Sequence, residues 1–524
     1  MSIHLACDLG AESGRLMLGT LAEGRLTLEE IHRFPNTPIR DGDSLHWNIP
    51  ALCEELTTGL RLAAARNLPI ASISTDSWGL DYVLLDERGQ ILPPTFCYRD
   101  PRTAQGMRNA LSRVDWPTIF TETGIQNMPI NTLYQLAAEG PARLVRAKML
   151  LGIGDFFNWF LSGQAVAEVS LASTFQLYNP RIGNWSELLL NALNLPRKLF
   201  PRIVPSGTRL GPLTALRQQE TSLPGIQVVA SCSHDTGAAV AAVPVAAVCD
   251  RRPSGGSGRA ATGVASQREA THLQEYFRDA HRAPLQLPDW AYISSGTWSL
   301  MGVERSEPIL SDEARELNFT NEIGHGNTVR LLKNIIGLWL VQECRRHWAA
   351  QGNDFDYATL ADLAADATPF RSLINPADPR FLPPGDMPGR IAAFCRETGQ
   401  PAPETPGQFI RCALESLALL YRKTLLQVEQ LTGAKIERLH VVGGGSRNAL
   451  LNQLTANACQ IPVLAGPIEA TSIGNILVQA IGLGQIQSLA KARSIVRESF
   501  DVTVFEPSDA ASWQAVLERF LRLI

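Results

Sequence analysis

The sequence lacks the nucleotide-binding strings that are easiest to recognise. No G-x-x-x-x-G-K-[ST] loop occurs, and no G-x-G-x-x-G string stands between an expected strand and an expected helix. The nine cysteines are scattered and form no Cys-x-x-Cys pair, which argues against a zinc site or a dithiol redox motif. If this chain binds a nucleotide, a different kind of loop must hold it.

Long apolar runs and a strong excess of charge are also missing. The longest nearly apolar stretch, residues 238–249, contains Pro244 and is too short to span a bilayer. The first residues lack the basic start and long apolar segment of a signal peptide. With 51 acidic and 47 basic residues, nothing indicates nucleic acid as the main partner. We therefore expect a cytoplasmic protein with no membrane or nucleic-acid partner, and its oligomeric state stays open.

Its length predicts two domains, because 524 residues exceed what one ordinary hydrophobic core supports. We expect an N-terminal domain at 1–244 and a C-terminal domain at 289–524. Residues 245–288, rich in Arg, Gly and Ser, are interpreted as an insertion or linker that supplies little core. A cleft between two domains is the natural place for a site.

Hydrophobic patterns predict an α/β fold in both halves. In the N-terminal half we expect strands at 3–7, 14–21, 25–34, 71–75 and 82–85, and a helix at 49–67. In the C-terminal half we expect a strand-turn-strand at 292–303, strands at 439–442 and 462–464, and helices at 328–348, 408–431 and 471–483. Both halves place glycine and small hydroxyl residues at a strand bend, which is weak evidence for a duplication.

The first candidate motif is Asp8-Leu9-Gly10-Ala11-Glu12-Ser13-Gly14-Arg15. An acidic residue at a strand end is followed by a bend whose backbone N–H groups can face phosphate oxygens. Ser13 and Arg15 add a hydroxyl and a guanidinium. An ordinary hairpin is the alternative for this string taken alone.

The second motif is Ser233-His234-Asp235-Thr236-Gly237, which follows an apolar run and precedes an Ala-rich helix. At such a junction Asp235 can cap the helix by accepting backbone N–H bonds. It can equally act as a general base that takes a proton from an attacking hydroxyl. The residues alone leave both roles open.

The third motif is Gly443-Gly444-Gly445-Ser446-Arg447-Asn448, again between a buried strand and a helix. Missing side chains let a ligand approach the backbone, although a tight turn would have the same sequence. Trp78 and Trp47 could stack on a sugar ring, but core packing is the better interpretation of an isolated tryptophan.

Taken together and in this order, these segments resemble the FGGY family of carbohydrate kinases. The resemblance covers nearly the whole chain except residues 245–288. It implies the two-domain, ribonuclease H-like fold of actin, hexokinase and the Hsp70 ATPase, with a cleft between the domains. The matching segments are 8–15, 76–81, 98–100, 233–236, 294–299, 332–339, 443–448 and 465–471.

By matching position, the resemblance also implies site residues. ATP phosphates would be held by Ala11, Glu12, Ser13, Gly14, Arg15 and Thr297, and the rest of the nucleotide by Gln342 and Gly444. The sugar would be bound by Gly79, His234, Asp235, Thr236 and Asn334, with Asp235 as the base. Mg²⁺ would be carried by ATP rather than by a protein metal site, with Asp8 as a helper acting through water.

Within the family, the match is closest to members that act on L-rhamnulose. The implied reaction moves the γ-phosphoryl of Mg-ATP to the 1-hydroxyl of L-rhamnulose and gives L-rhamnulose 1-phosphate and ADP, a step of L-rhamnose catabolism. One alternative is a family kinase for fuculose, xylulose or ribulose. Another is a non-catalytic sugar-binding regulator, which would not need Asp235 as a base. An ATPase chaperone would need a substrate-binding domain that the sequence does not indicate.

One residue departs from the family pattern inside the expected phosphate loop. Glu12 stands where the family usually has a serine. A carboxylate beside ATP phosphates is unfavourable unless it points away or meets a cation. The arginines of residues 245–288 could cover the cleft or bind a partner, although a surface loop is the simplest interpretation.

Overall fold

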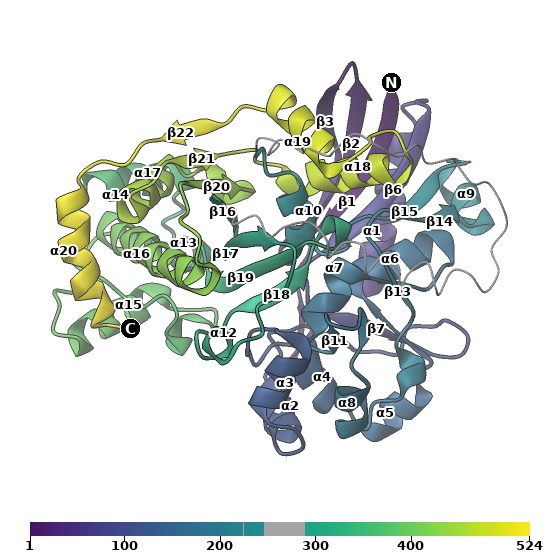
Figure 1. Ribbon diagram of the computed structural model, residues 1–524, viewed down its shortest axis with the longest axis horizontal. Helices are drawn as coiled ribbons and strands as arrows, with labels where there is room; N and C mark the ends of the chain where they lie inside the picture. Colours follow the sequence, from purple (N-terminus) through teal and green to yellow (C-terminus); the bar gives the residue numbers. More distant parts are fainter. Residues whose placement is uncertain (224, 246–288) are drawn as a thin grey trace.

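The computed structural model describes residues 1–223, 225–245 and 289–524. Figure 1 shows two lobes, one built around the N-terminal strands and one around the long helix α16 (Pro406–Thr432). Apart from Val245, the expected insertion at 245–288 lies outside the described residues.

The N-terminal lobe is built on a sheet that opens with an antiparallel meander. β1 pairs antiparallel with β2 and parallel with β6, so the first strand lies inside the sheet. A turn at Glu23 and Gly24 joins β2 to β3, and both residues have positive φ. The strands in sheet order are β14 (Thr208–Pro212), β15 (Gln227–Ala230), β6 (Ile70–Ser77), β1 (Ser2–Leu9), β2 (Ser13–Ala22) and β3 (Arg25–Pro35).

Helices and short strand pairs complete this lobe. The expected first helix is present, begins after Asn48, whose side chain accepts a bond from Ala51 N, and buries Leu52, Leu56 and Leu60. The helices are α1 (Ile49–Ala64), α2 (Arg102–Leu111), α3 (Trp116–Thr123), α4 (Thr132–Ala137), α5 (Pro141–Arg146), α6 (Ile153–Ser162), α7 (Val169–Ala172), α8 (Glu187–Ala192), α9 (Ala215–Thr221) and α10 (Asp235–Ala241). The short strands are β4 (Ile39–Asp41), β5 (Ser44–Trp47), β7 (Tyr82–Leu85), β8 (Thr95–Phe96), β9 (Met149–Gly152), β10 (Ala167–Glu168), β11 (Tyr178–Asn179), β12 (Asn184–Trp185) and β13 (Ile203–Val204).

The C-terminal lobe repeats the same arrangement. β16 pairs antiparallel with β17 and parallel with β20, as β1 does with β2 and β6. The strands in sheet order are β18 (Thr320–Ile323), β19 (Val329–Ile336), β17 (Trp298–Arg305), β16 (Trp290–Ser295), β20 (Arg438–Val442), β21 (Val463–Ala465) and β22 (Thr503–Phe505). Two sheets with one topology are consistent with a duplicated fold.

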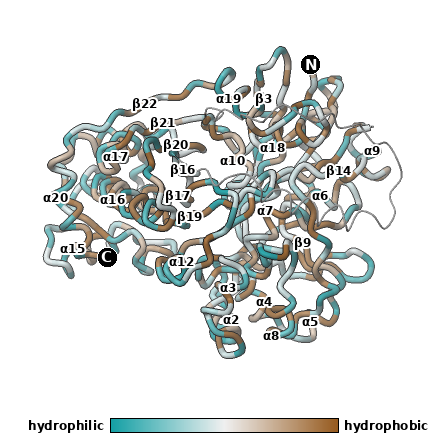
Figure 2. Tube along the Cα trace, viewed as in Figure 1, coloured by the Kyte–Doolittle hydropathy of each residue, from teal (hydrophilic) through white to brown (hydrophobic). Residues whose placement is uncertain are grey.

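Several helices of this lobe pack against α16. Thr405 caps its first turn, Gly433 ends it with φ 67°, and hydrophobic positions recur along its length (Figure 2). Among the described helices, none combines the length and the apolar character needed to cross a bilayer. The remaining helices are α12 (Asp312–Glu316), α13 (Trp339–Ala350), α14 (Tyr357–Asp366), α15 (Met387–Glu397), α17 (Ala449–Cys459), α18 (Ala470–Gly482), α19 (Leu489–Ser499) and α20 (Ala510–Leu521).

The prediction of a helix at 328–348 is wrong for the first half of that range. Residues Val329–Ile336 form β19, which lies between β17 and β18, and the helix begins only at Trp339. A strand that is buried in a sheet reads as a continuous apolar run, and periodicity alone does not separate it from a buried helix. The strand ends and the helix has not yet begun at Gly337, which is packed so closely that a Cβ there would lie 2.5 Å from Ser299 Oγ.

The two lobes meet where α10 packs against α18, in the middle of Figure 1. A Cβ placed on Gly474 of α18 would lie 1.8 Å from the backbone oxygen of Ala238 in α10. From α18, Gln479 also donates to the backbone oxygen of Leu5 in β1 at 2.9 Å. The absence of a side chain at Gly474 therefore sets how closely the lobes approach.

We predict that Gly474→Ala destabilises the protein, since the new methyl group meets backbone that cannot rotate away. Overpacking of this kind costs about 1–3 kcal/mol. Denaturant unfolding should show this loss. Gly140→Ala is the matched control, because a Cβ there meets no described atom within 4 Å. Equal stability of the two variants would contradict the close contact.

Candidate active site

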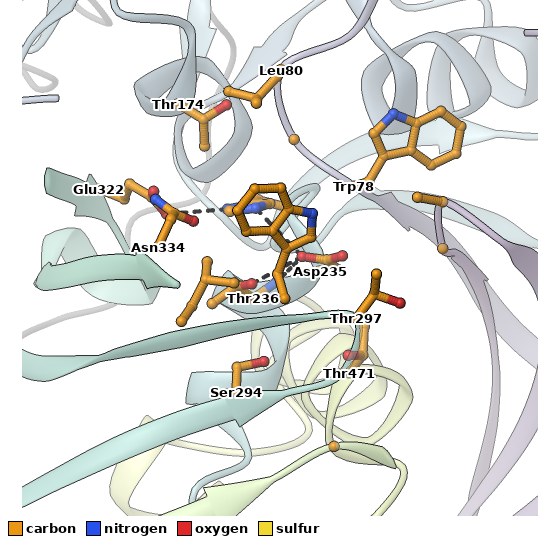
Figure 3. Close-up of a pocket in the computed structure, with 18 of the residues that line it drawn as sticks. Trp78, Leu80, Thr174, Asp235, Thr236, Ser294, Thr297, Glu322, Asn334 and Thr471 are labelled. Atoms are coloured by element: carbon orange, nitrogen blue, oxygen red, sulfur yellow. Dashed lines mark hydrogen bonds and ion pairs between the residues drawn. The ribbon is translucent and has the colours of Figure 1, made fainter. Parts of the chain in front are cut away.

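A pocket of about 290 Å³ lies between the two lobes and collects residues from all three sequence motifs. Asp235 and Thr236 project from the start of α10, facing Thr297 from the other lobe (Figure 3). The residues expected from the sequence that line this pocket are Asp8, Ala11, Arg15, Gly79, His234, Asp235, Thr236, Thr297, Asn334 and Gly444.

Asp235 is the carboxylate best placed to take a proton in this pocket. It is the first residue of α10, while His234 stands at the capping position before it. Its Oδ1 accepts the hydroxyl of Thr236 at 3.0 Å and the backbone N–H of the same residue. The side chain is 32% exposed, and the residue lines the pocket. Burial raises the pKa of Asp235, His234 lowers it, and the charge of Asp8 raises it.

His234 lies beside Asp235 and under Gly79. Its Nε2 is 3.4 Å from Asp235 Oδ1. A Cβ on Gly79 would lie 3.2 Å from the same Nε2, so glycine leaves the imidazole and the space above it open. The segment that carries His234 and Asp235 is held by hydrogen bonds on the side away from the pocket. Ser233 N–H donates to Glu168 at 2.8 Å, and His234 N–H donates to Ser170 Oγ at 3.2 Å. This support fixes the direction of the two side chains.

Asn334 reaches the pocket from β19, opposite α10. Its backbone N–H and side-chain Nδ2 both donate to Gln126 Oε1, at 2.9 and 3.2 Å. Gln126 belongs to the N-terminal lobe and also lines the pocket. The amide of Asn334 is therefore oriented by a residue across the cleft.

Two backbone turns form the other end of the pocket. The turn at Thr297 is tied to the start of α13, because Thr297 O accepts the N–H of Gly337 at 3.0 Å. Gly443 has φ 86°, and a Cβ on Gly445 would lie 2.0 Å from Ser295 Oγ. Between them, a Cβ on Gly444 meets no described atom within 4 Å. The glycines thus bring two turns together and leave open backbone facing the pocket.

The segment from Asp8 to Arg15 spans the end of β1, the turn and the start of β2. Its one guanidinium, that of Arg15, is already paired with protein carboxylates. Arg15 donates to Asp8 Oδ2 at 3.0 and 2.7 Å and also pairs with Glu469, just before α18. Arg15 lines the pocket while held by these two carboxylates. Its charge is therefore partly neutralised by the protein.

Glu12 meets a cation, which removes the difficulty expected from the sequence. Its carboxylate lies 2.7 Å from Nη2 of Arg346 on α13, in the opposite lobe. Arg346 also pairs with Glu343. The two groups are 36% and 50% exposed, so water screens the pair. Glu12 therefore does not present an uncompensated charge to the cleft.

Four expected residues lie outside the pocket lining, namely Glu12, Ser13, Gly14 and Gln342. Ser13 and Gly14 begin β2 directly behind the turn. Gln342 lies on α13 one helical turn before Arg346, and its buried Oε1 has no hydrogen-bond partner among the described residues. These residues sit beside the pocket rather than in its wall.

Several pocket residues were not predicted as site residues from the sequence. Trp78 is nearly buried against Trp47, at 4.5 Å between ring centroids, yet also lines the pocket, so core packing was only half of its environment. Glu322 reaches the pocket from β18, where no strand was expected. Further lining residues that were not singled out are Leu80, Ile125, Gln126, Met128, Ile130, Asn131, Thr174, Ser294, Thr320 and Thr471.

The carboxylates of the pocket do not form a metal cluster. Within residues 1–223, 225–245 and 289–524, no group of three or more His, Cys, Asp or Glu side chains could hold a metal ion. The pocket carboxylates are Asp8, Asp235 and Glu322.

Comparison with known proteins gives matches along the whole chain. Models of the N-terminal and C-terminal domains of the FGGY family of carbohydrate kinases match residues 3–242 and 291–483. A curated protein from Bacteroides thetaiotaomicron named rhamnulokinase is 43% identical over 518 residues, covering 98% of each chain. A protein of the same name from Enterococcus faecalis is 39% identical, covering 98% of this chain and 97% of the relative.

Solved structures share the fold at much lower identity. A ligand-bound xylulose kinase from Lactobacillus acidophilus superposes with a TM-score of 0.76 at 13% identity, covering 100% of this chain and 98% of the other. Plasmodium falciparum glycerol kinase with ADP gives a TM-score of 0.73 at 13% identity, covering 100% and 97%. The expected two-domain, actin-like α/β fold is therefore confirmed.

Proposed function

The chain belongs to the FGGY family of carbohydrate kinases, and we propose that it transfers the γ-phosphoryl of ATP to the 1-hydroxyl of L-rhamnulose. The products are L-rhamnulose 1-phosphate and ADP. The observation that carries this proposal is the position of Asp235, a carboxylate in a pocket shared with Thr297 and Gly444 from the opposite lobe. The relatives named rhamnulokinase support the choice of sugar.

The sugar occupies the part of the pocket around α10. His234, Thr236 and Asn334 supply donors and acceptors for its hydroxyl groups, and Gly79 leaves room for the ring. L-Rhamnulose is a 6-deoxy sugar, so one end carries a methyl group. The apolar side chains of Leu80, Ile125 and Ile130 give that methyl group a suitable wall.

Asp235 acts as the general base. Its carboxylate accepts the proton of the 1-hydroxyl as that oxygen attacks the γ-phosphorus, and ADP leaves on the opposite side. The hydrogen bonds from Thr236 hold the carboxylate in one orientation. Phosphoryl transfer needs little covalent help from the protein, so positioning and charge neutralisation account for most of the catalysis.

ATP occupies the end of the pocket made by the turns. We assign phosphate contacts to Thr297 and to the segment Ala11, Glu12, Ser13, Gly14 and Arg15, and contacts with the rest of the nucleotide to Gly444 and Gln342. Mg²⁺ carried by ATP would supply neutralisation of the phosphate charge. Asp8 is a pocket carboxylate on this side, paired with Arg15, and would contact the ion through water.

In this proposal the two halves have separate tasks. Residues 1–244 form the sugar-binding domain and residues 289–524 the nucleotide-binding domain. The base and most sugar contacts come from the first, and Thr297, Gln342 and Gly444 come from the second. Asn334 is the exception, since it reaches the sugar from the second domain.

We predict that Asp235→Asn lowers kcat by about 10²-fold or more while sugar binding persists, because the amide cannot accept the proton. Turnover should be measured by ADP release and sugar affinity by calorimetry. Asp312→Asn, at the first position of α12, is a matched control that should leave both unchanged. An unchanged rate in Asp235→Asn would disprove the assignment of Asp235 as the base.

The pH profile should reflect the environment of the same carboxyl group. Burial raises the pKa of Asp235, and the base works only when ionised. The acidic limb of kcat/KM should therefore fall at a higher pH than the pKa of an exposed aspartate, about 3.9. A limb at or below that value would contradict the assignment of Asp235.

A ketose panel tests the substrate. L-Rhamnulose should exceed L-fuculose, D-xylulose and D-ribulose in kcat/KM under a coupled ADP assay. Loss of one methyl contact costs about 1–3 kcal/mol, so sugars without it should be about 10- to 200-fold poorer. Equal rates across the panel would reject L-rhamnulose as the preferred substrate while leaving the kinase assignment intact.

A double-mutant cycle tests the position of Glu12. Arg346→Ala leaves the Glu12 carboxylate without its cation, so KM for ATP should rise a few-fold, within the roughly 1 kcal/mol of an exposed ion pair. Glu12→Ser in the same variant should restore KM, because the repulsion is removed. If the double variant binds ATP as poorly as Arg346→Ala, Glu12 does not face the phosphates.

A further inference from the structure

Behind the pocket, a buried ion pair from the C-terminal sheet touches the imidazole of His234. Glu322 and Arg330 stand directly opposite each other in the β18–β19 ladder, with Glu322 Oε2 3.3 Å from Arg330 Nη2. The Arg330 side chain is fully buried and does not line the pocket, whereas Glu322 does. No step of the proposed reaction uses Arg330.

Both members of this pair face the same ring nitrogen. His234 Nδ1 lies 3.3 Å from Arg330 Nη2, a donor, and 3.4 Å from Glu322 Oε2, an acceptor. The other ring nitrogen, Nε2, lies 3.4 Å from Asp235 Oδ1. Figure 3 shows Glu322 and Asp235 among the residues that line the pocket. The four groups form a chain from the sheet to the base.

This geometry favours one position for the hydrogen of the neutral ring. If Nδ1 accepts from Arg330, that hydrogen is on Nε2. When the ring is protonated, Nδ1–H faces Glu322 and the second hydrogen is again on Nε2. Asp235 therefore meets an N–H in both states and never a ring lone pair, which would repel its carboxylate.

Hydrogen bonds between the lobes keep the Glu322–Arg330 pair next to His234. On the strand that carries Glu322, Asn321 N–H and Nδ2 donate to Gly124 O at 2.9 and 3.0 Å. The N–H of Ile323 donates to Ser173 Oγ at 2.9 Å. Both acceptors belong to the N-terminal lobe, so β18 is anchored to the lobe that carries the base.

The pKa of Glu322 and the burial of Arg330 agree with these contacts. Burial alone would raise the pKa of Glu322, but His234 and Arg330 together bring it below its ordinary value. Nε and Nη1 of Arg330 have no hydrogen-bond partner among the described residues, although the side chain is buried. Burying a guanidinium with unpaired N–H groups costs free energy, because buried polar groups are otherwise hydrogen-bonded. That Arg330 is buried despite this cost indicates that it has a specific role.

We propose that Glu322 and Arg330 are positioning residues that hold His234 in the tautomer with hydrogen on Nε2, directed at the carboxylate of Asp235. This inference rests on the proposed role of Asp235 as the base. The N–H stabilises the ionised carboxylate before the hydroxyl proton arrives. Neither Glu322 nor Arg330 exchanges a proton with the substrate.

The direct test is nitrogen NMR of protein labelled with ¹⁵N-histidine. The sequence has nine histidines, and the signal of His234 is the one missing in His234→Asn. In the wild-type protein without ligands, the neutral ring should carry its hydrogen on Nε2. A neutral ring with hydrogen on Nδ1 would overturn the proposal. This readout needs no turnover, so it stands even if the sugar or the reaction is assigned wrongly.

Arg330→Met should move the hydrogen to Nδ1, because Glu322 becomes the only described partner of that atom. Glu322→Gln should keep it on Nε2, since Arg330 still donates. If Arg330→Met does not fold with one buried charge left, the double variant Glu322→Leu/Arg330→Met removes both charges, and it should give a mixture of tautomers. A single Nε2–H tautomer in the variants that lack Arg330 would overturn the proposal.

Kinetics then connect the tautomer to the base. In the variants that lose the Nε2–H tautomer, kcat should fall about 10- to 100-fold with KM for ATP unchanged. The acidic limb should move to higher pH, because Asp235 loses a stabilising N–H while the charge of Asp8 still raises its pKa. The matched control is Glu415→Gln, a buried glutamate paired with Arg411 outside the pocket, which should leave the pH profile unchanged. A tautomer change with unaltered kcat and pH profile would overturn the positioning role.

Discussion

The close contact between α10 and α18 is the constraint on which the site depends. It is possible only because Gly474 has no side chain where the Ala238 carbonyl approaches. Asp235 begins one of these helices, and Glu469, which pairs with Arg15, directly precedes the other. One helix contact therefore sets the distance between the proposed base and the turn expected to hold phosphate.

Around this contact, the protein buries several ionisable side chains. Asp76 is fully buried, has a pKa well above its ordinary value through burial and the charge of Asp8, and accepts a hydrogen bond from Asn475 of α18. Arg15 and Asp8 neutralise each other nearby. Uncompensated buried charge is expensive, so pairing across the lobes allows carboxylates to remain close to a site that must also receive ATP.

Much of this architecture could be predicted from the sequence, because its signals are local. The meander, the helix ending at Gly433 and the junction before Asp235 each depend on neighbouring residues. The contacts between distant strands could not be predicted. Residues Val329–Ile336 were expected to be helical, and that error concealed the cross-strand pair of Glu322 and Arg330. Likewise, nothing local to Glu12 indicates that Arg346, on another lobe, would meet it.

The contacts across the cleft differ in how easily they break. Glu12 and Arg346 are well exposed, and an exposed ion pair contributes at most about 1 kcal/mol, so the cleft can part there at little cost. The bonds from Asn321 to Gly124 and from Arg330 to His234 are buried, and breaking them would leave polar groups without water. Opening for ATP should therefore begin on the side of Glu12, while the sugar side and its base keep their geometry.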